Sequence, residues 1–219
     1  MSEYRLLAIG PEVESASAVA ILAHGRGGSP EDMARLAAAF DVPEIAYLLP
    51  GAPGNTWYPQ SFMAPFETNE PYLSRSLANH ARLIDEVIAR GVPAERIALG
   101  GFSQGACLTA ETLVREPRRY GAAIILTGGV IGPSGTRWAA RRALAGTPVY
   151  LSGSEIDPHV PPSRARETER VLKESGAVVE VRIFADRPHT VSEEEIAKGR
   201  DLLLALVATS DGAVRRVGG

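Results

Sequence analysis

The sequence has a single cysteine and no excess of either charge. Cys107 has no second cysteine with which to form a disulfide inside the chain, and paired thiols for a metal are absent. Lys and Arg number 23 and Asp and Glu number 26, which gives a net charge of -3 without any basic block. This balance argues against nucleic acid, and equally against an anionic membrane surface, as the main partner.

Long apolar runs, a secretory leader and cofactor motifs are lacking too. No apolar run approaches the roughly 18 residues that span a bilayer, and the first ten residues lack a basic start followed by an apolar stretch. No H-E-x-x-H metal motif occurs, and the glycine-rich residues 24–28 do not have the G-x-G-x-x-G spacing of a dinucleotide site. We therefore expect a cytoplasmic protein with no membrane span, no metal and no cofactor.

What the sequence does contain is an alternation of aliphatic runs and amphipathic segments. The aliphatic runs are typical of strands buried on both faces and cover residues 19–22, 45–49, 96–99, 122–126, 149–151 and 178–184. Helical spacing follows Ser29, covers residues 73–88, and resumes after Pro161 and Ser192. We predict an α/β fold, a mostly parallel sheet with helices on both faces, whose first strand begins near Leu6 or Val19. One domain covers residues 1–208, and residues 209–219 form a flexible tail.

Residues 50–71 do not follow this alternation of strand-like and helix-like segments. They hold five of the sixteen prolines and four of the thirteen aromatic residues. Long ordered loops in compact domains are usually functional, and the aromatic content argues against disorder. We expect this loop to contribute to a binding site; the alternative is a loop that only covers the edge of the sheet.

The strongest chemical signal follows the strand at residues 96–99. The next residues read Gly-Gly-Phe-Ser-Gln-Gly-Ala, and a helical run covers residues 107–115, so a G-x-S-x-G pattern lies between a strand and a helix. In such a turn, side chains at Gly101 and Gly105 would collide with neighbouring backbone, and the serine hydroxyl is exposed above the sheet. The pattern predicts that Ser103 is a nucleophile; the alternative is a chance turn.

A serine nucleophile needs a histidine base later in the chain. His189 follows the strand at residues 178–184 and precedes a capped helix, which is the expected place in the order serine, acid, histidine. His159 is the competing candidate. His24 lies upstream beside glycines, and His80 lies in a helix, where we expect a solvated surface side chain.

The acid that orients this base is expected after the preceding strand, residues 149–151. Glu155 and Asp157 both follow that strand, and the shorter Asp157 is preferred. Asp186 is a weaker candidate because it lies too close to His189 in sequence to reach Nδ1 easily. We therefore predict a triad of Ser103, His189 and Asp157.

The same chemistry needs two N–H donors for a developing oxyanion. One is the backbone N–H after the nucleophile, at Gln104. The other is expected in residues 23–28, because glycines allow the backbone to approach a substrate oxygen closely. The alternatives for that segment are a plain glycine-rich turn or a phosphate-binding loop.

Together these motifs resemble the phospholipase/carboxylesterase family of α/β-hydrolases, which includes acyl-protein thioesterases. The resemblance rests on four segments: His24-Gly25-Arg26-Gly27, Gly101-Phe102-Ser103-Gln104-Gly105, Asp157-Pro158-His159-Val160-Pro161, and His189. It implies an α/β-hydrolase fold and an oxyanion hole formed by the N–H groups of Arg26 and Gln104. It also implies that Trp57 lines an acyl pocket and that residues 127–131 form the turn after the sixth strand of the fold. The substrate-binding residues expected on this basis are His24, Gly25, Trp57, Tyr58 and Phe62.

The predicted function is that of a serine carboxylesterase acting on short- to medium-chain esters, with a small-molecule ester as partner. Arg26 and the proline-rich loop resemble the bacterial small-ester hydrolases of the family more than its thioesterases. The alternatives are a thioesterase or lysophospholipase with the same triad, and a non-catalytic binding protein of the hydrolase fold. The Arg26 side chain is expected either to bind a carboxylate or phosphate of the substrate or to cap the loop at residues 50–71. A homodimer is the commonest assembly for such a domain.

Overall fold

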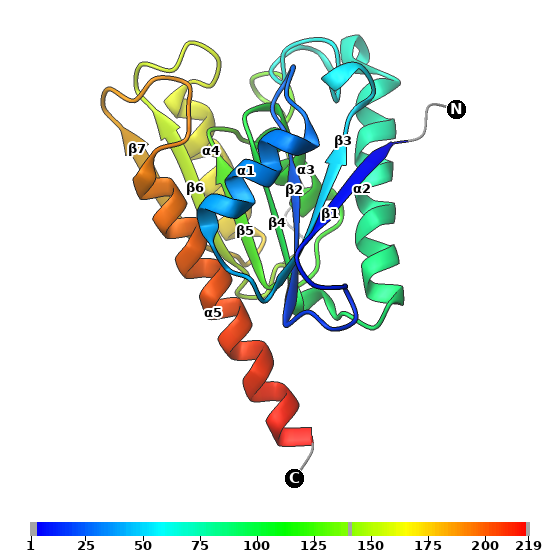
Figure 1. The fold of residues 1–219 in the computed structure, drawn as a ribbon. Helices are drawn as coiled ribbons and strands as arrows, with labels where there is room; N and C mark the ends of the chain where they lie inside the picture. Colours follow the sequence, from blue (N-terminus) through cyan, green and yellow to red (C-terminus); the bar gives the residue numbers. More distant parts are fainter. Residues whose placement is uncertain (1–3, 140–141, 218–219) are drawn as a thin grey trace.

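Seven strands form one twisted sheet at the centre of the molecule (Figure 1). The computed structural model describes residues 4–139 and 142–217. The strands are β1 (Arg5–Ile9), β2 (Ala18–Ala23), β3 (Ile45–Gly51), β4 (Ile97–Phe102), β5 (Ala122–Leu126), β6 (Pro148–Ser154) and β7 (Val178–Phe184), in the order β1-β3-β2-β4-β5-β6-β7. β1 runs antiparallel to β3, and all the other pairs are parallel. The predicted mostly parallel sheet is confirmed, with its first strand at the earlier of the two expected starts.

Helices cover both faces of this sheet. They are α1 (Pro30–Phe40), α2 (Tyr72–Ala89), α3 (Gln104–Arg115), α4 (Pro162–Glu174) and α5 (Glu193–Val217), with short 3₁₀ turns at Pro53–Asn55, Phe66–Asn69 and Ala94–Arg96. α1 and α5 pack on one face, and α2, α3 and α4 on the other (Figure 1). Over the described residues, no helix is long and apolar enough to cross a membrane.

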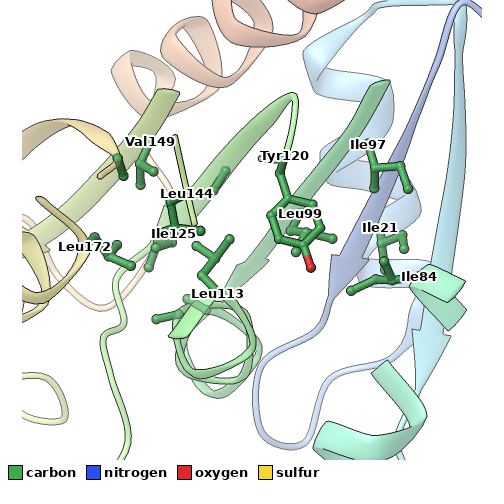
Figure 2. Packing of buried hydrophobic residues seen from close by; sticks show 14 of the residues in the cluster. Ile21, Ile84, Ile97, Leu99, Leu113, Tyr120, Ile125, Leu144, Val149 and Leu172 are labelled. Carbon is green, nitrogen blue, oxygen red and sulfur yellow. The ribbon is translucent and has the colours of Figure 1, made fainter. Parts of the chain in front are cut away.

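Burial on both faces explains why the central strands show no polar alternation. All six residues of β2 are buried; Val19 and Ile21 face the α2-α3-α4 layer, while Ala20 and Leu22 face α1 and α5. Figure 2 shows the first of these layers, where Ile21 and Leu99 of the sheet lie near Ile84 of α2 and Leu113 of α3. Removing apolar surface of this kind from water is the main driving force for the fold.

The C-terminal helix is longer than the sequence predicts. α5 continues to Val217, past residue 209, where the sequence predicts that a flexible tail begins; residues 218 and 219 lie outside the described residues. Gly212 lies inside this helix, where one glycine costs only about 1 kcal/mol relative to alanine. The end of α5 extends beyond the sheet (Figure 1).

Candidate active site

The parallel strands end at one edge of the sheet, and the segments predicted to carry chemistry all follow these ends. Ser103 follows β4, Asp157 follows β6 and His189 follows β7, while residues 24–28 follow β2. In open α/β sheets, ligands bind at this edge. The fold thus brings together segments more than 80 residues apart.

The turn between β4 and α3 has the geometry of a nucleophile elbow. Ser103 has φ 54° and ψ −117°, a strained conformation for a residue with a side chain. A Cβ at Gly101 would lie 2.6 Å from the Ala23 carbonyl oxygen, and one at Gly105 would lie closer still to the same carbonyl. Only glycine fits at these two positions, which is the physical reason for the G-x-S-x-G spacing.

Three side chains form one hydrogen-bonded chain at this turn. His189 Nε2 lies 2.8 Å from Ser103 Oγ, and His189 Nδ1 lies 2.6 Å from Asp157 Oδ2. Both distances are within hydrogen-bond range, and His189 lies between the hydroxyl and the carboxylate. The predicted serine, histidine and acid are therefore in contact in the order that nucleophilic catalysis requires.

Asp157 remains a strong acceptor despite its burial. Its other oxygen, Oδ1, accepts hydrogen bonds from the N–H groups of His159 and Val160 at 2.8 and 2.9 Å. Burial alone would raise the pKa of Asp157, but the hydrogen bonds from His189 and these two amides outweigh it and hold the pKa below its usual value. An ionised Asp157 is suited to stabilise a positively charged His189.

The competing acids lie away from this chain of contacts. Glu155 is exposed and forms an ion pair with Arg166 at 3.3 Å. Asp186 is exposed, and the described residues give it no hydrogen bond to His189.

The other three histidines have different roles in the structure. His24 is buried: its Nε2 accepts the Ala52 N–H at 3.0 Å, so Nδ1 donates to the Gly25 carbonyl at 2.7 Å. Burial also lowers the pKa of His24. The ring of His159 packs edge-on against His189, with 4.9 Å between ring centroids, so it flanks the candidate base.

His80 is not the surface residue that the sequence suggested. It is only 3% exposed, and its Nδ1 lies 3.0 Å from the hydroxyl of Thr112 on α3. His80 lies on the buried, mostly apolar face of α2. A search for hydrophobic residues at helical spacing passes over a histidine on that face, so the sequence pattern does not show its burial. Burial lowers its pKa to about 4.

A cleft of about 410 Å³ opens at the candidate nucleophile. Its lining residues are Arg26, Tyr58, Pro59, Gln60, Ser61, Phe62, Ser103, Gln104, Cys107, His159, Val160 and His189. Tyr58 and Phe62 thus lie where substrate contacts were expected. Cys107 also lines the cleft, and burial raises its pKa to about 12, so its thiol stays protonated.

Three expected substrate contacts lie outside this lining. His24, Gly25 and Trp57 do not reach the cleft. The indole Nε1 of Trp57 donates to the His24 carbonyl at 2.8 Å, and the Trp57 ring lies 4.9 Å from the His24 ring. This buried contact holds the loop at residues 50–71 on the side away from the cleft, so Trp57 supports the wall of the cleft but does not line it.

The Gln104 side chain attaches the loop at residues 50–71 to the nucleophile turn. Its Oε1 accepts the Trp57 N–H at 3.0 Å, and its Nε2 donates to the Tyr58 carbonyl at 2.7 Å. The sequence predicts a role only for the backbone N–H of Gln104. A buried amide that follows a nucleophile needs partners, but the sequence does not say which segment supplies them.

The Arg26 side chain holds the same loop from the other side. Its Nη1 and Nη2 donate to the carbonyls of Pro59 and Gln60 at 2.7 and 2.6 Å. Of the two expectations for this side chain, the structure shows the loop cap. The predicted oxyanion donors are the backbone N–H groups of Arg26 and Gln104, and in the described part of the chain neither has a hydrogen-bond acceptor.

Most of the chain resembles proteins of one family. Residues 6–205 match the family described as Phospholipase/Carboxylesterase. A crystal structure of a phospholipase/carboxylesterase from Dyadobacter fermentans has 38% sequence identity and a TM-score of 0.87, and the similarity covers 92% of this chain and 97% of that one.

Curated relatives are matched over shorter segments. Acyl-protein thioesterase 1 of Eremothecium gossypii is 33% identical over 123 residues, which cover 54% of this chain and 51% of that protein. Carboxylesterase SOBER1 of Arabidopsis thaliana is 26% identical over 157 residues, which cover 72% of this chain and 62% of that protein. The matched segments thus span only about half to three fifths of these relatives. With the fold, the serine turn and the family match in agreement, this chain belongs to the phospholipase/carboxylesterase family of α/β-hydrolases.

Proposed function

We propose that the protein is a serine carboxylesterase that hydrolyses short- to medium-chain esters through an acyl-enzyme. The observation that carries the proposal is the hydrogen-bonded chain from Ser103 through His189 to Asp157 at the base of an open cleft. A hydroxyl becomes a useful nucleophile only beside such a base, and a base of this kind works best when a third group orients it.

The reaction has two halves with the same proton carrier. As Ser103 Oγ attacks the ester carbonyl carbon, His189 Nε2 takes the hydroxyl proton, and it then donates that proton to the departing alkoxide. The C–O bond to the alcohol breaks and an acyl-serine remains. Water, deprotonated by the same nitrogen, then attacks the acyl carbon. The bond between that carbon and Ser103 Oγ breaks, His189 returns the proton to Oγ, and the carboxylic acid leaves. Asp157 stabilises the imidazolium that forms in each half.

Negative charge on the carbonyl oxygen is stabilised by two backbone N–H groups. Gln104 is the first residue of α3, so its N–H lies at the positive end of the helix dipole. The Arg26 N–H lies in the loop after β2. Each donor of this kind is typically worth about 100- to 1000-fold in rate.

The cleft supports short or medium acyl chains. Its volume of about 410 Å³ is at the low end of the roughly 300–1,000 Å³ of small-molecule sites. Buried side chains of Tyr58, Phe62 and Cys107 lie along its wall, and the loop that carries the first two is attached at Arg26 and Gln104. A long acyl chain would require that loop to move.

A thioesterase is the second candidate, because one relative is named an acyl-protein thioesterase. The triad and oxyanion donors act on the carbonyl carbon, so they serve oxygen and sulfur esters alike. A lysophospholipase would use the same groups on a longer acyl chain. A binding protein with an unused triad is less well supported, because all three side chains keep their contacts.

Hydrolysis of p-nitrophenyl esters from acetate to decanoate, by the wild type and Ser103→Ala, tests the proposal. We expect kcat/KM to be highest for the shorter esters and Ser103→Ala to lose at least about 1000-fold while it stays folded. Matched oxygen and sulfur esters of one acyl group, measured in parallel, separate esterase from thioesterase. Highest activity on decanoate would favour the lipid-cleaving alternative, and hydrolysis retained in Ser103→Ala would overturn the mechanism.

A further inference from the structure

A buried arginine beside the candidate base takes no part in the mechanism above. Arg187 lies two residues before His189 and is only 6% exposed. Its Nη1 donates to the carbonyls of Pro188, at 3.0 Å, and Thr190, the two residues that flank His189. The guanidinium therefore holds the backbone on both sides of the imidazole.

The other end of the guanidinium contacts the end of β5, the strand next to β4. Arg187 Nη2 donates to Thr127 Oγ1 at 2.7 Å. Thr127 directly follows Leu126, whose carbonyl accepts the N–H of Ser103 at 2.9 Å. A continuous set of bonds thus joins the backbone of the nucleophile to the loop of the base, independently of the bond between their side chains.

Two further contacts fix Arg187 itself. Glu195 is fully buried, and its Oε2 lies 3.4 Å from Arg187 Nε. The same oxygen accepts the Ser192 N–H at 2.7 Å, as part of the capping box at the start of α5. The Ser154 hydroxyl, at the end of β6 just before the acid loop, donates to the Arg187 carbonyl at 2.6 Å. Arg187 therefore contacts the segments that carry His189 and Asp157 directly, and it is linked to the Ser103 backbone only through Thr127 and Leu126.

We propose that Arg187 is a positioning residue that sets the placement of His189 between Ser103 and Asp157, with Thr127 and Glu195 as its anchors. The inference rests on the proposed function, because it concerns the base of that reaction. A guanidinium is suited to the task, since its planar fork offers several donors in fixed directions, whereas a lysine ammonium acts as a single point charge. Arg187 touches no reacting atom.

Two variants and one control test this role. Arg187→Lys keeps the charge beside Glu195 but loses the fork, and Thr127→Val removes the acceptor oxygen while it keeps the β-branched shape. Arg182→Lys is the matched control, because Arg182 forms an exposed ion pair with Glu194 at 2.7 Å and, like Arg187, stacks on Phe184. The measurements are kcat and KM on a short p-nitrophenyl ester, the melting temperature, and amide exchange of residues 186–191.

We expect kcat to fall about 10- to 100-fold in Arg187→Lys and Thr127→Val with KM within about threefold, since a displacement of about 1 Å in a catalytic group costs on the order of 100-fold. Amide exchange over the loop should rise in both, and Arg182→Lys should stay within about twofold of the wild type. If Arg187→Lys does not fold, Thr127→Val decides.

Unchanged kcat in the folded variants, or an equal loss in Arg182→Lys, would overturn the positioning role. A loss confined to the melting temperature would also overturn it, because it would show that Arg187 only stabilises the fold. These results differ from failure of the proposed function, in which the wild type itself would not hydrolyse the ester or would not need Ser103.

Discussion

Among single residues, the candidate site depends on the strained backbone conformation of Ser103 and on the lowered pKa of the buried Asp157. Ser103 keeps a left-handed φ of 54° because the glycine-lined turn packs tightly around it. Asp157 is buried among three hydrogen-bond donors, which lower its pKa in spite of burial. Both are features that a mere structural turn would not need.

Asp157→Asn should lower kcat about 10,000-fold, because an amide cannot stabilise the imidazolium and favours the wrong tautomer of His189. The measurement is hydrolysis of a saturating short ester by the folded variant. Glu155→Gln is the control, since Glu155 is exposed and pairs with Arg166, and it should stay near the wild-type rate. A loss of less than about tenfold in Asp157→Asn would argue for another acid.

At the scale of elements, the loop at residues 50–71 is part of the site. Gln104 joins it to the start of α3, and Arg26 joins it to the loop after β2. Asn69 adds bonds inside the loop, where its side chain accepts the Gln60 N–H at 2.8 Å and donates to the Ser61 carbonyl at 2.9 Å. A loop held at so many points forms a preorganised wall.

Arg26→Met should lower kcat/KM by a similar factor, about tenfold, on neutral and on negatively charged esters, because the guanidinium holds the loop carbonyls of Pro59 and Gln60. Arg35→Met, which removes an exposed arginine of α1, is the control for charge. A loss restricted to negatively charged esters would mean that Arg26 binds the substrate's anion instead.

Local motifs, such as a turn that follows a strand, can be predicted from the sequence, whereas side-chain hydrogen bonds between distant segments cannot. Ser103 could be found because glycines are needed on both sides of it, and His189 and Asp157 because each follows a buried strand. The bonds from Gln104 to Trp57 and from Arg187 to Thr127 join residues 47 and 60 positions apart, and no local pattern marks them.

At the scale of the whole molecule, burial of titratable groups makes stability depend on pH. His80 is buried between α2 and α3, and burial lowers its pKa to about 4 from an ordinary value of 6.5. The unfolded chain therefore takes up a proton near pH 6.5 that the folded protein takes up only near pH 4. The stability that neutral His80 contributes is complete above about pH 6.5 and is lost as the pH falls toward 4.

His80→Gln tests this dependence. Between pH 6.5 and 4 the wild type should lose up to about 3 kcal/mol more unfolding free energy than the variant, which has no proton to take up there. Urea unfolding at several pH values measures the difference, and His24, also buried, is common to both proteins and cancels. Parallel curves for the two proteins across this range would show that His80 does not titrate as a buried group.

In the proposed reaction, Ser103 is a nucleophile activated by His189. The most direct measurement is reaction with an alkyl fluorophosphonate, followed by the intact mass and by location of the adduct in the peptide that contains Ser103. We expect one adduct per chain, on Ser103, that is absent in Ser103→Ala and forms much more slowly in His189→Ala. Absence of any adduct on the wild type, or an adduct elsewhere with Ser103 unmodified, would contradict it.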